Sequence, residues 1–428
     1  MTPTAFDADN FVATLSNGVR VVVIELPYLE SVNVSVFVRT GSSHESRRLN
    51  GISHFVEHMA FKGTHERTCQ QINLDAERLG AEVNAHTDKD HTAYHMRGLA
   101  RDSGRFIGML ADIVRNSTFP EAELERERQV ILHEVMEDDD DALSTADKLF
   151  DKAWFGSHPL AQPVIGSRLN IQRFARAELL GYVQQQYTGA NVVVGIAGNV
   201  DAQRIVKEAE AAFAAMPRGS ENTVPVPDYI GGVASRSQAG HSQTHIVFGY
   251  PIPTLKDDYH ASVVAAALFG EGMSSPLLDE IRERRGLVYH ADCSADVTEL
   301  SGQFVIEAST APEHVEEFFV EVKRLLAAHA QSVDPVGLER ARNQIAVRRL
   351  RDAERASRRL EGAALDVFVH GRVRSRAELM ARVDAVTADE VRDAFARMLA
   401  SPASVAIAGR LRKGAVERVR ELFPARPG

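Results

Sequence analysis

The hydrophobic positions of the chain follow two different periods, which predict strands and helices in alternation. Residues 18–24 form a short apolar run, and valines alternate with other residues across 32–38, as they do in half-buried strands. Residues 120–137 and 176–186 place apolar side chains at helical spacing, and 191–198 form another apolar run typical of a buried strand. The pattern therefore predicts a protein of mixed helix and sheet.

The second half of the chain repeats the pattern of the first. Three segments match in the same order at offsets of roughly 210 residues, which is too long for the unit of a solenoid. The matched pairs are 193–198 with 405–409, 78–83 with 284–289, and 124–128 with 338–342. Residues 217–232 are dense in proline, glycine and polar residues, as linkers are. We therefore predict a domain over 1–217, a linker over 218–232 and a homologous domain over 233–428, with a chance coincidence of common patterns as the alternative.

Composition and charge exclude several classes of protein. The 428 residues are 44% hydrophobic and 25% charged, which is ordinary for a globular protein and unlike a disordered or collagen-like chain. With 49 lysines and arginines against 59 aspartates and glutamates, the net charge is −10, so nucleic acid is a poor partner. Cys69 and Cys293 are too few for a disulfide scaffold or a cysteine-rich zinc site, and they point to a reducing compartment.

The sequence predicts no targeting segment and no membrane span. The N-terminus reads MTPTAFDADNFVATLSNG, without a basic stretch followed by an apolar one. No apolar run approaches the roughly 18 residues that a membrane helix needs. We therefore expect a soluble cytoplasmic protein with no membrane partner, unless a targeting segment precedes this sequence.

Residues 51–64, GISHFVEHMAFKGT, carry the strongest chemical signal. His54, Glu57 and His58 form H-x-x-E-H, the motif of inverzincin metallopeptidases. Residues four apart share one face of a helix, so both imidazoles can bind one metal ion, and Glu57 projects toward the same face. A metal ion there lowers the pKa of a bound water to about 7, and the Glu57 carboxylate can accept its proton. Chance or a solvated histidine pair is the alternative, but the apolar residues inside the motif and the acidic helix downstream favour a metal site.

A catalytic zinc site needs a third protein ligand, and the helix predicted over 120–137 offers candidates. Glu134 is the leading choice, with His133 and Glu137 as competing choices on the same helix. Glu127 lies two turns before Glu134 on the same face. We expect it to orient a histidine ligand through a hydrogen bond.

At these residues the sequence resembles the pitrilysin-type zinc metallopeptidases, and among them the half-length members related to the β-subunit of mitochondrial processing peptidase. The resemblance extends over nearly the whole chain, and the separation of His58 and Glu134 fits the family. It implies that one zinc ion per chain is bound by His54, His58 and Glu134. Glu57 would then be the general base and Glu127 the supporting carboxylate.

The resemblance also implies where substrate binds. Residues 80–85 resemble the family's active-site edge strand, where a substrate backbone adds as a further strand and contacts Asn84 and Ala85. An ordinary strand and turn is the alternative. Phe61 resembles a residue that lines the pocket after the scissile bond, although a bare aromatic residue is more often core.

Two residues of the second half resemble an Arg/Tyr pair that reaches the active site from the other domain in this family. They are Arg282 and Tyr289, within DEIRERRGLVYHA. A tyrosine can hydrogen-bond a tetrahedral oxyanion, and an arginine can fix a substrate carbonyl or hold the tyrosine in place.

The second half lacks the ligands of the first. When the halves are aligned, Ser262, Ala265 and Ala266 fall opposite the metal motif, and Arg348 falls opposite Glu134. A serine and two alanines cannot replace two imidazoles and a base. The resemblance accordingly implies one catalytic domain and one that completes the substrate chamber.

The family implies a fold and a function for the whole chain. We expect the α+β class, with two homologous α/β domains, each a mostly antiparallel sheet with helices packed on one face, arranged as a clam-like pair. The expected function is a zinc-dependent endopeptidase that hydrolyses unfolded or extended peptides. A homodimer is the expected assembly, with a heterodimer with a metal-free sister subunit as the alternative. A catalytically inactive scaffold or assembly subunit, and a module with a structural zinc, are the other functions considered.

The acidic run at 137–141 limits what can be said about substrates. It could attract basic peptides, but the later positions at which processing peptidases carry acids are Ser144 and Lys148. A solvated helix turn is the alternative. The sequence therefore gives no basis for predicting specificity for presequences.

Overall fold

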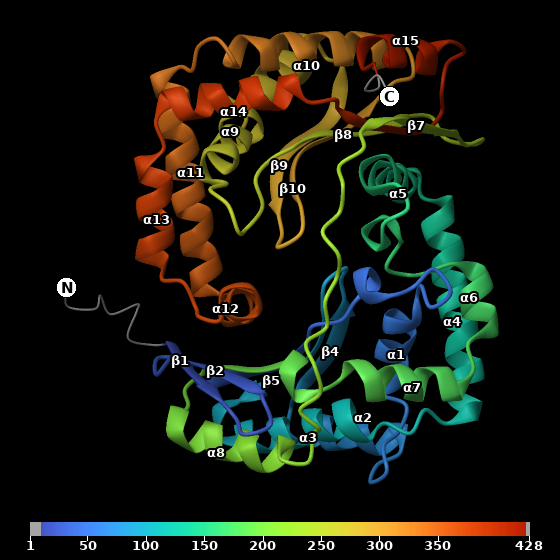
Figure 1. Ribbon diagram of the computed structural model, residues 1–428, viewed down its shortest axis with the longest axis vertical. Coiled ribbons are helices and arrows are strands. Elements are labelled where there is room, and N and C mark those ends of the chain that lie inside the picture. The colour runs from blue at the N-terminus through green and yellow to red at the C-terminus, as the bar shows by residue number, and fades with distance from the viewer. Residues whose placement is uncertain (1–9, 425–428) are drawn as a thin grey trace. The chain divides into compact units, whose positions relative to one another are not determined.

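The computed structural model describes residues 10–424, which form two compact units, each with its own sheet (Figure 1). Unit 1 comprises the chain up to Met136, Gln162–Pro225 and Arg351–Arg376. Unit 2 comprises Glu137–Ala161, Val226–Leu350 and the chain from Ala377.

The sheet of unit 1 has six strands in the order β1-β2-β6-β3-β5-β4. The β2–β6 pair is parallel and the other four pairs are antiparallel. The strands are β1 (Asn10–Thr14), β2 (Arg20–Glu25), β3 (Ser31–Val38), β4 (Glu82–Thr87), β5 (Thr92–Leu99) and β6 (Val192–Gly198). Strand β4 therefore lies at one edge.

The sheet of unit 2 has five strands in the order β7-β11-β8-β10-β9. They are β7 (Gly232–Ser237), β8 (Thr244–Pro251), β9 (Val288–Val297), β10 (Gly302–Thr310) and β11 (Ser404–Gly409). The β7–β11 pair is parallel and the rest are antiparallel. Apart from β1, the order and the position of the parallel pair repeat those of unit 1, in agreement with the internal repeat of the sequence. The mostly antiparallel character of both sheets is confirmed.

Both faces of the unit 1 sheet are covered by helices. Along β2, Val21 and Val23 belong to the core shared with α3 and α8, whereas Val22 and Ile24 contact α12 on the opposite face. A strand buried on both faces needs apolar residues at every position, which accounts for the unbroken apolar run of β2. The helices of this unit are α1 (Ile52–Ala60), α2 (Cys69–Arg78), α3 (Ser103–Asn116), α4 (Glu121–Asp140, mostly), α6 (Arg168–Arg173), α7 (Arg176–Gln186), α8 (Ala202–Phe213) and α12 (Ala356–His370).

The unit 2 sheet is covered on two faces in the same way. One core joins it to α9, α10 and α14, and a second core on the other face joins Val247, Val305 and Ala406 to Phe150 and Trp154 of α5. The helices are α5 (Ala142–Phe155), α9 (His260–Gly270), the π-helix η5 (Leu277–Arg284), α10 (Val315–His329), α11 (Pro335–Glu354, mostly), α13 (Arg376–Ala385), α14 (Ala388–Ala400) and α15 (Ala415–Leu422).

Each unit thus includes one helix that comes from the other half of the sequence. Helix α12 follows the unit 2 strands β7–β10 in sequence but belongs to unit 1, and α5 precedes β6 but belongs to unit 2. The compact units are therefore discontinuous, unlike the contiguous halves predicted on either side of 218–232, and each sheet has helices on two faces rather than one. Residues 218–231 themselves contain no helix or strand.

Between residues 10 and 424, no helix is both long and apolar enough to cross a membrane.

Candidate metal centre

Helix α1 carries the H-x-x-E-H residues, and its N-terminus is fixed by a buried carboxylate. Glu45, which is 1% exposed, accepts hydrogen bonds from the backbone N–H groups of Gly51 and Ser53, each at 2.8 Å, and from Asn50 Nδ2 at 3.1 Å. Gly51 has φ 96°, and a Cβ added to Gly51 would lie only 2.8 Å from the Cα of Gly166. Burial raises the pKa of Glu45, although the hydrogen bonds from Ser53 and Gly51 oppose the shift. Sequence reasoning missed this cap because Glu45 lies too far before the helix for a local capping motif.

Helix α1 buries one face and presents the metal motif on the other. Phe55 and Met59 are fully buried in the unit 1 core, whereas His54, Glu57 and His58 are only partly buried. This division follows from the helical period, which separates residues at positions 55 and 59 from those at 54 and 58.

Helix α4 brings Glu134 to the two histidines. Its carboxylate Oε2 lies 3.5 Å from His58 Nε2 and 3.8 Å from His54 Nε2, and one ligand atom from each of the three residues lies within 4.8 Å of the others. Tetrahedral zinc with bonds of 2.0–2.1 Å separates its ligands by about 3.3–3.4 Å, so the cluster is close to the size that zinc needs. The competing candidates His133 and Glu137 are exposed and do not join this group among the residues described.

The protonation of the two histidines differs because their surroundings differ. Burial, reinforced by the nearby His58, lowers the pKa of His54 to about 3. Burial also acts to lower the pKa of His58, but the hydrogen bond to Glu127 and the charges of Glu134 and Glu57 outweigh it and raise that pKa. His54 is therefore neutral and able to bind a metal, whereas His58 keeps its second proton to a higher pH than an ordinary histidine and binds a metal only after releasing it.

Glu127 holds His58 in the orientation that a metal ligand needs. Its Oε2 lies 3.1 Å from His58 Nδ1, and its Oε1 forms an ion pair with Lys62 Nζ at 2.7 Å. Burial alone would raise the pKa of Glu127, but the hydrogen bonds from His58 and Lys62 hold it below its ordinary value. An ionised Glu127 accepts a hydrogen bond from His58 Nδ1–H, so the proton that His58 gives up when a metal binds comes from Nε2, the nitrogen that faces Glu134. Nothing in the sequence pattern marks Lys62 for this role.

The Glu57 carboxylate lies beside this cluster and is fixed by β4. Its Oε2 accepts a hydrogen bond from Thr87 Oγ1 at 3.0 Å. Burial raises the pKa of Glu57 and Glu134 adds to the effect, while His58 and Thr87 oppose it. A carboxylate with a raised pKa is a stronger base than one in water, which suits a proton acceptor. Thr87 was not predicted, because nothing local marks a threonine that contacts a helix 30 residues earlier.

The donor set fits zinc. Two imidazoles and one carboxylate are the ligands of a catalytic zinc site, and they leave a fourth position for water or substrate. When bound, zinc acts as a Lewis acid that polarises a carbonyl and acidifies water.

The predicted substrate-binding residues lie along or near the edge of the unit 1 sheet. Among residues 10–424, β4 pairs only with β5, so its other edge is unpaired. Asn84 is exposed and its Oδ1 accepts a hydrogen bond from the Ala85 N–H at 2.8 Å. Phe61 follows α1 and packs partly buried against the core, with its ring 6.0 Å from that of Tyr94.

Arg282 and Tyr289 belong to unit 2. Arg282 is in η5 and its Nη1 lies 3.8 Å from Met273 Sδ, while Tyr289, on β9, is 80% exposed. The described part of unit 2 contains no counterpart of the metal cluster. Instead, Arg348 on α11 pairs with Glu271 at 2.6 Å.

The acidic run serves local structure in unit 2. Asp138 and Asp139 both pair with Lys148, the latter at 3.0 Å. Asp141 caps α5, with its carboxylate 2.8 Å from the Ser144 backbone nitrogen. These contacts favour the structural interpretation of the run over a role in attracting basic peptides.

Comparisons with known proteins cover both halves of the chain. Residues 20–168 match the family described as Insulinase (Peptidase family M16), and residues 173–345 match the Peptidase M16 inactive domain. A Rickettsia bellii protein named uncharacterized zinc protease is 33% identical over 404 residues, which are 94% of this chain and 98% of that protein. A Mycobacterium tuberculosis protein of the same description is 33% identical over 400 residues, or 91% and 90% of the two chains.

Solved structures show the same fold. The crystal structure of a protease from Helicobacter pylori has a TM-score of 0.85 at 21% identity, and the match covers 93% of this chain and 98% of that one. A Pseudomonas fluorescens structure described as a peptidase M16 inactive domain also has a TM-score of 0.85 at 21% identity. The family resemblance of the sequence is therefore confirmed: the chain is a half-length member of peptidase family M16, whose relatives are named zinc proteases.

Proposed function

We propose that the protein is a zinc-dependent endopeptidase that hydrolyses unfolded or extended peptides, with one catalytic zinc held by His54, His58 and Glu134. The observation that carries the proposal is the convergence of these three ligands beside the Glu57 carboxylate. Membership in a family of zinc proteases supports the same reaction class.

The chain's own residues would divide the work as follows. Glu57 accepts the proton of the attacking water and then donates it to the nitrogen of the leaving amine. Glu127 and Lys62 keep His58 in its ligand tautomer. Thr87 holds the Glu57 carboxylate, so that its position is set before substrate arrives.

The free edge of β4 supports extended peptides as substrates. A backbone in extended conformation can add to an unpaired edge strand through main-chain hydrogen bonds, which need no particular side chains. The Asn84 side chain already accepts from the Ala85 N–H, so that donor is partnered while substrate is absent. A folded protein would have to unfold locally to present such a strand.

The Glu57→Gln variant tests this proposal. Glutamine keeps the shape of the side chain but cannot accept the proton, so cleavage of a quenched fluorescent peptide should fall by about 10²–10⁴-fold. Zinc content, measured by mass spectrometry of the purified protein, should stay unchanged because Glu57 is not a ligand. The control is Glu77→Gln, at an exposed carboxylate of α2 in the same unit, which should behave as wild type. Cleavage at the wild-type rate by Glu57→Gln would exclude Glu57 as the base.

The same proposal includes a dimer as the working assembly, by the resemblance to half-length peptidases. Sedimentation velocity of the purified chain should show a homodimer. A monomer that becomes active only after a second, metal-free protein is added would support the heterodimer instead.

A further inference from the structure

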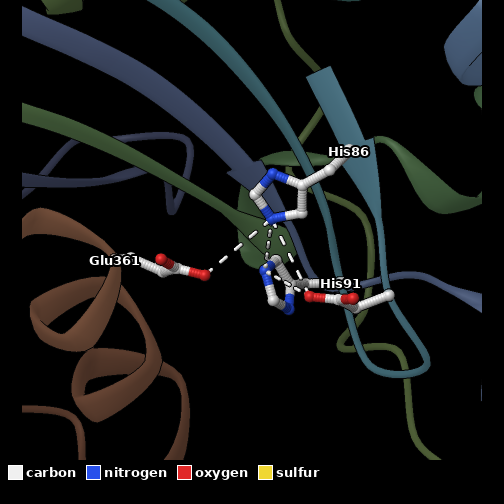
Figure 2. A group of neighbouring side chains, drawn as sticks. His86, His91 and Glu361 are labelled. Carbon is white, nitrogen blue, oxygen red and sulfur yellow. Dashed lines mark hydrogen bonds and ion pairs between the residues drawn. The ribbon is translucent and has the colours of Figure 1, made fainter. Parts of the chain in front are cut away.

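A second group of metal-binding side chains lies at the end of β4, apart from the H-x-x-E-H residues. It consists of His86, Asp88, His91 and Glu361, and one ligand atom from each lies within 4.8 Å of the others. The first three surround the turn from β4 to β5, and Glu361 reaches them from α12 (Figure 2). All four belong to unit 1.

The separations of the ligand atoms fit one tetrahedral cation. His86 Nε2 lies 3.4 Å from His91 Nε2, 3.8 Å from an Asp88 carboxylate oxygen and 4.0 Å from Glu361 Oε1. His91 Nε2 lies 3.7 Å from the same Asp88 oxygen. The edges of a tetrahedron with bonds of 2.0–2.1 Å are about 3.3–3.4 Å. The His86–His91 separation and the separations of both rings from Asp88 are within a few tenths of an ångström of that value, whereas Glu361, which lies within 4.8 Å of the other three ligand atoms, would have to move closer to complete the site.

Hydrogen bonds on the far side of each ring favour the ligand tautomer of both histidines. His91 Nδ1 lies 2.7 Å from Asp90 Oδ1, which can only accept when ionised. His86 Nδ1 lies 2.9 Å from His95 Nε2, and His95 Nδ1 lies 2.8 Å from Ser35 Oγ. If His86 Nδ1–H donates to His95 Nε2, then His95 carries its own proton on Nδ1 and donates it to Ser35 Oγ, and both contacts are satisfied. Both Nε2 lone pairs then face each other across 3.4 Å, which is repulsive unless a cation or a proton lies between them.

The candidate site lies at the protein surface, and neighbouring residues restrict the movement of some of its side chains. The side chain of His91 is 4% exposed and that of Glu361 is 26% exposed, while Asp88 faces solvent. Arg358 binds the other oxygen of Glu361 at 3.1 Å and leaves Oε1 directed at His86. Two carboxylates balance the charge of a divalent cation, and two imidazoles favour zinc or a similar transition metal over calcium or magnesium.

We propose that His86, Asp88, His91 and Glu361 bind a second divalent transition-metal ion, which fastens α12 to the β4–β5 turn. The site would join segments that lie more than 250 residues apart in sequence, at the helix that covers the second face of the unit 1 sheet. It would also fix the ends of the segment that contains Thr87, whose hydroxyl holds Glu57. The full metal content of the chain would then be two ions, and not the single zinc that the sequence predicted.

Zinc binding to the full-length protein tests this proposal separately from the catalytic site. Metal-free protein is titrated with Zn²⁺ in a calorimeter, as wild type and as His58→Ala, which removes a ligand of the first site. Wild type should bind two ions and His58→Ala should still bind one. Adding Glu361→Gln to His58→Ala should weaken the remaining site at least 10-fold, and adding His86→Ala should abolish it.

The matched control is Glu354→Gln, which changes an exposed carboxylate seven residues before Glu361. Combined with His58→Ala, it should leave the remaining site unchanged. Thermal unfolding provides a second readout, because Zn²⁺ should raise the Tm of the His58→Ala protein and not that of His58→Ala/Glu361→Gln. If His58→Ala binds no zinc, or binds it with the same affinity after Glu361→Gln and His86→Ala, the second site is excluded. If only the proposed catalytic site fails to bind zinc, wild type should instead bind a single zinc ion, and His86→Ala should abolish that binding.

Discussion

At the scale of single residues, the two histidines of the cluster formed by His54, His58 and Glu134 differ in the hydrogen bonds that orient their rings. His58 is held through Nδ1 by Glu127, which is itself held by Lys62. His54 Nδ1 is buried and has no hydrogen-bond partner among the described residues. A metal bound by Nε2 would fix the His54 ring directly, whereas the orientation of His58 is set beforehand.

The Glu127→Gln variant should therefore weaken zinc binding by about 10- to 100-fold while leaving the fold intact. The amide keeps the shape of the carboxylate, but it loses the charge that raises the pKa of His58 and that pairs with Lys62. Competition with a chelator of known affinity measures the change. Glu125→Gln on the same helix, at an exposed carboxylate, is the control, and equal affinities of the two variants would contradict the supporting role of Glu127.

The grouping of His54, His58 and Glu134 could be predicted from the sequence because its members follow local spacing rules. His54, Glu57 and His58 lie within two turns of one helix, and Glu134 was found because a catalytic zinc requires a third ligand on a facing element. Thr87 and Glu361 could not be found in this way. Their roles depend on which strand end and which helix come together in the fold, and single-sequence patterns do not contain that information.

At the scale of elements, α1 is positioned by Glu45 rather than by its own sequence. The helix begins at Ile52 after a glycine, which has no side chain to cap it, and the Glu45 carboxylate serves its first N–H groups instead. The placement of the two histidines therefore depends on a residue outside the helix. Strands and long helices were predictable from their periods, but this cap was not.

The Glu45→Gln variant should lower the free energy of unfolding by about 1–3 kcal/mol, because the amide nitrogen would face a backbone N–H that needs an acceptor. Urea denaturation measures the loss. Glu30→Gln, at an exposed residue of the same unit, should change little. A Glu45→Gln protein as stable as wild type would show that the cap does not stabilise α1.

The same carboxylate predicts a dependence of stability on pH. Burial raises the pKa of Glu45 in the folded protein, so the folded state binds this proton more tightly than the unfolded state does. The contribution of this proton to the free energy of unfolding is present in full below the ordinary pKa of glutamate. It is lost as pH rises through the higher pKa of the folded protein. The free energy of unfolding of wild type, relative to Glu45→Gln, should therefore fall as pH rises over that interval. A difference that rises instead would contradict the raised pKa.

At the scale of the whole molecule, the chain forms two similar units that each take a helix from the other half of the sequence. The repeat of strand order was visible in the sequence because equivalent strands and helices have similar patterns. The exchange of α5 and α12 was not visible. An amphipathic helix shows that it covers an apolar face, but nothing in its pattern shows which sheet provides that face.

The exchange predicts how a truncated protein behaves. A fragment of residues 1–217 lacks α12, so Val22, Ile24, Val193 and Ala197 would be exposed on one face of its sheet. It should aggregate or unfold without cooperativity, as seen by light scattering and thermal denaturation. Joining residues 351–376 to the fragment through a flexible linker should restore a cooperative transition. A fragment of 1–217 that is monomeric and folds cooperatively alone would support the contiguous domain instead.

We propose above all that His54, His58 and Glu134 hold a zinc ion beside Glu57. Crystals of the zinc-loaded protein, measured on both sides of the zinc absorption edge, test it most directly. We expect an anomalous peak within about 2.0–2.2 Å of His54 Nε2, His58 Nε2 and a Glu134 oxygen. A zinc-loaded crystal without a peak at this position, or with a peak that Glu134 does not ligate, would contradict it.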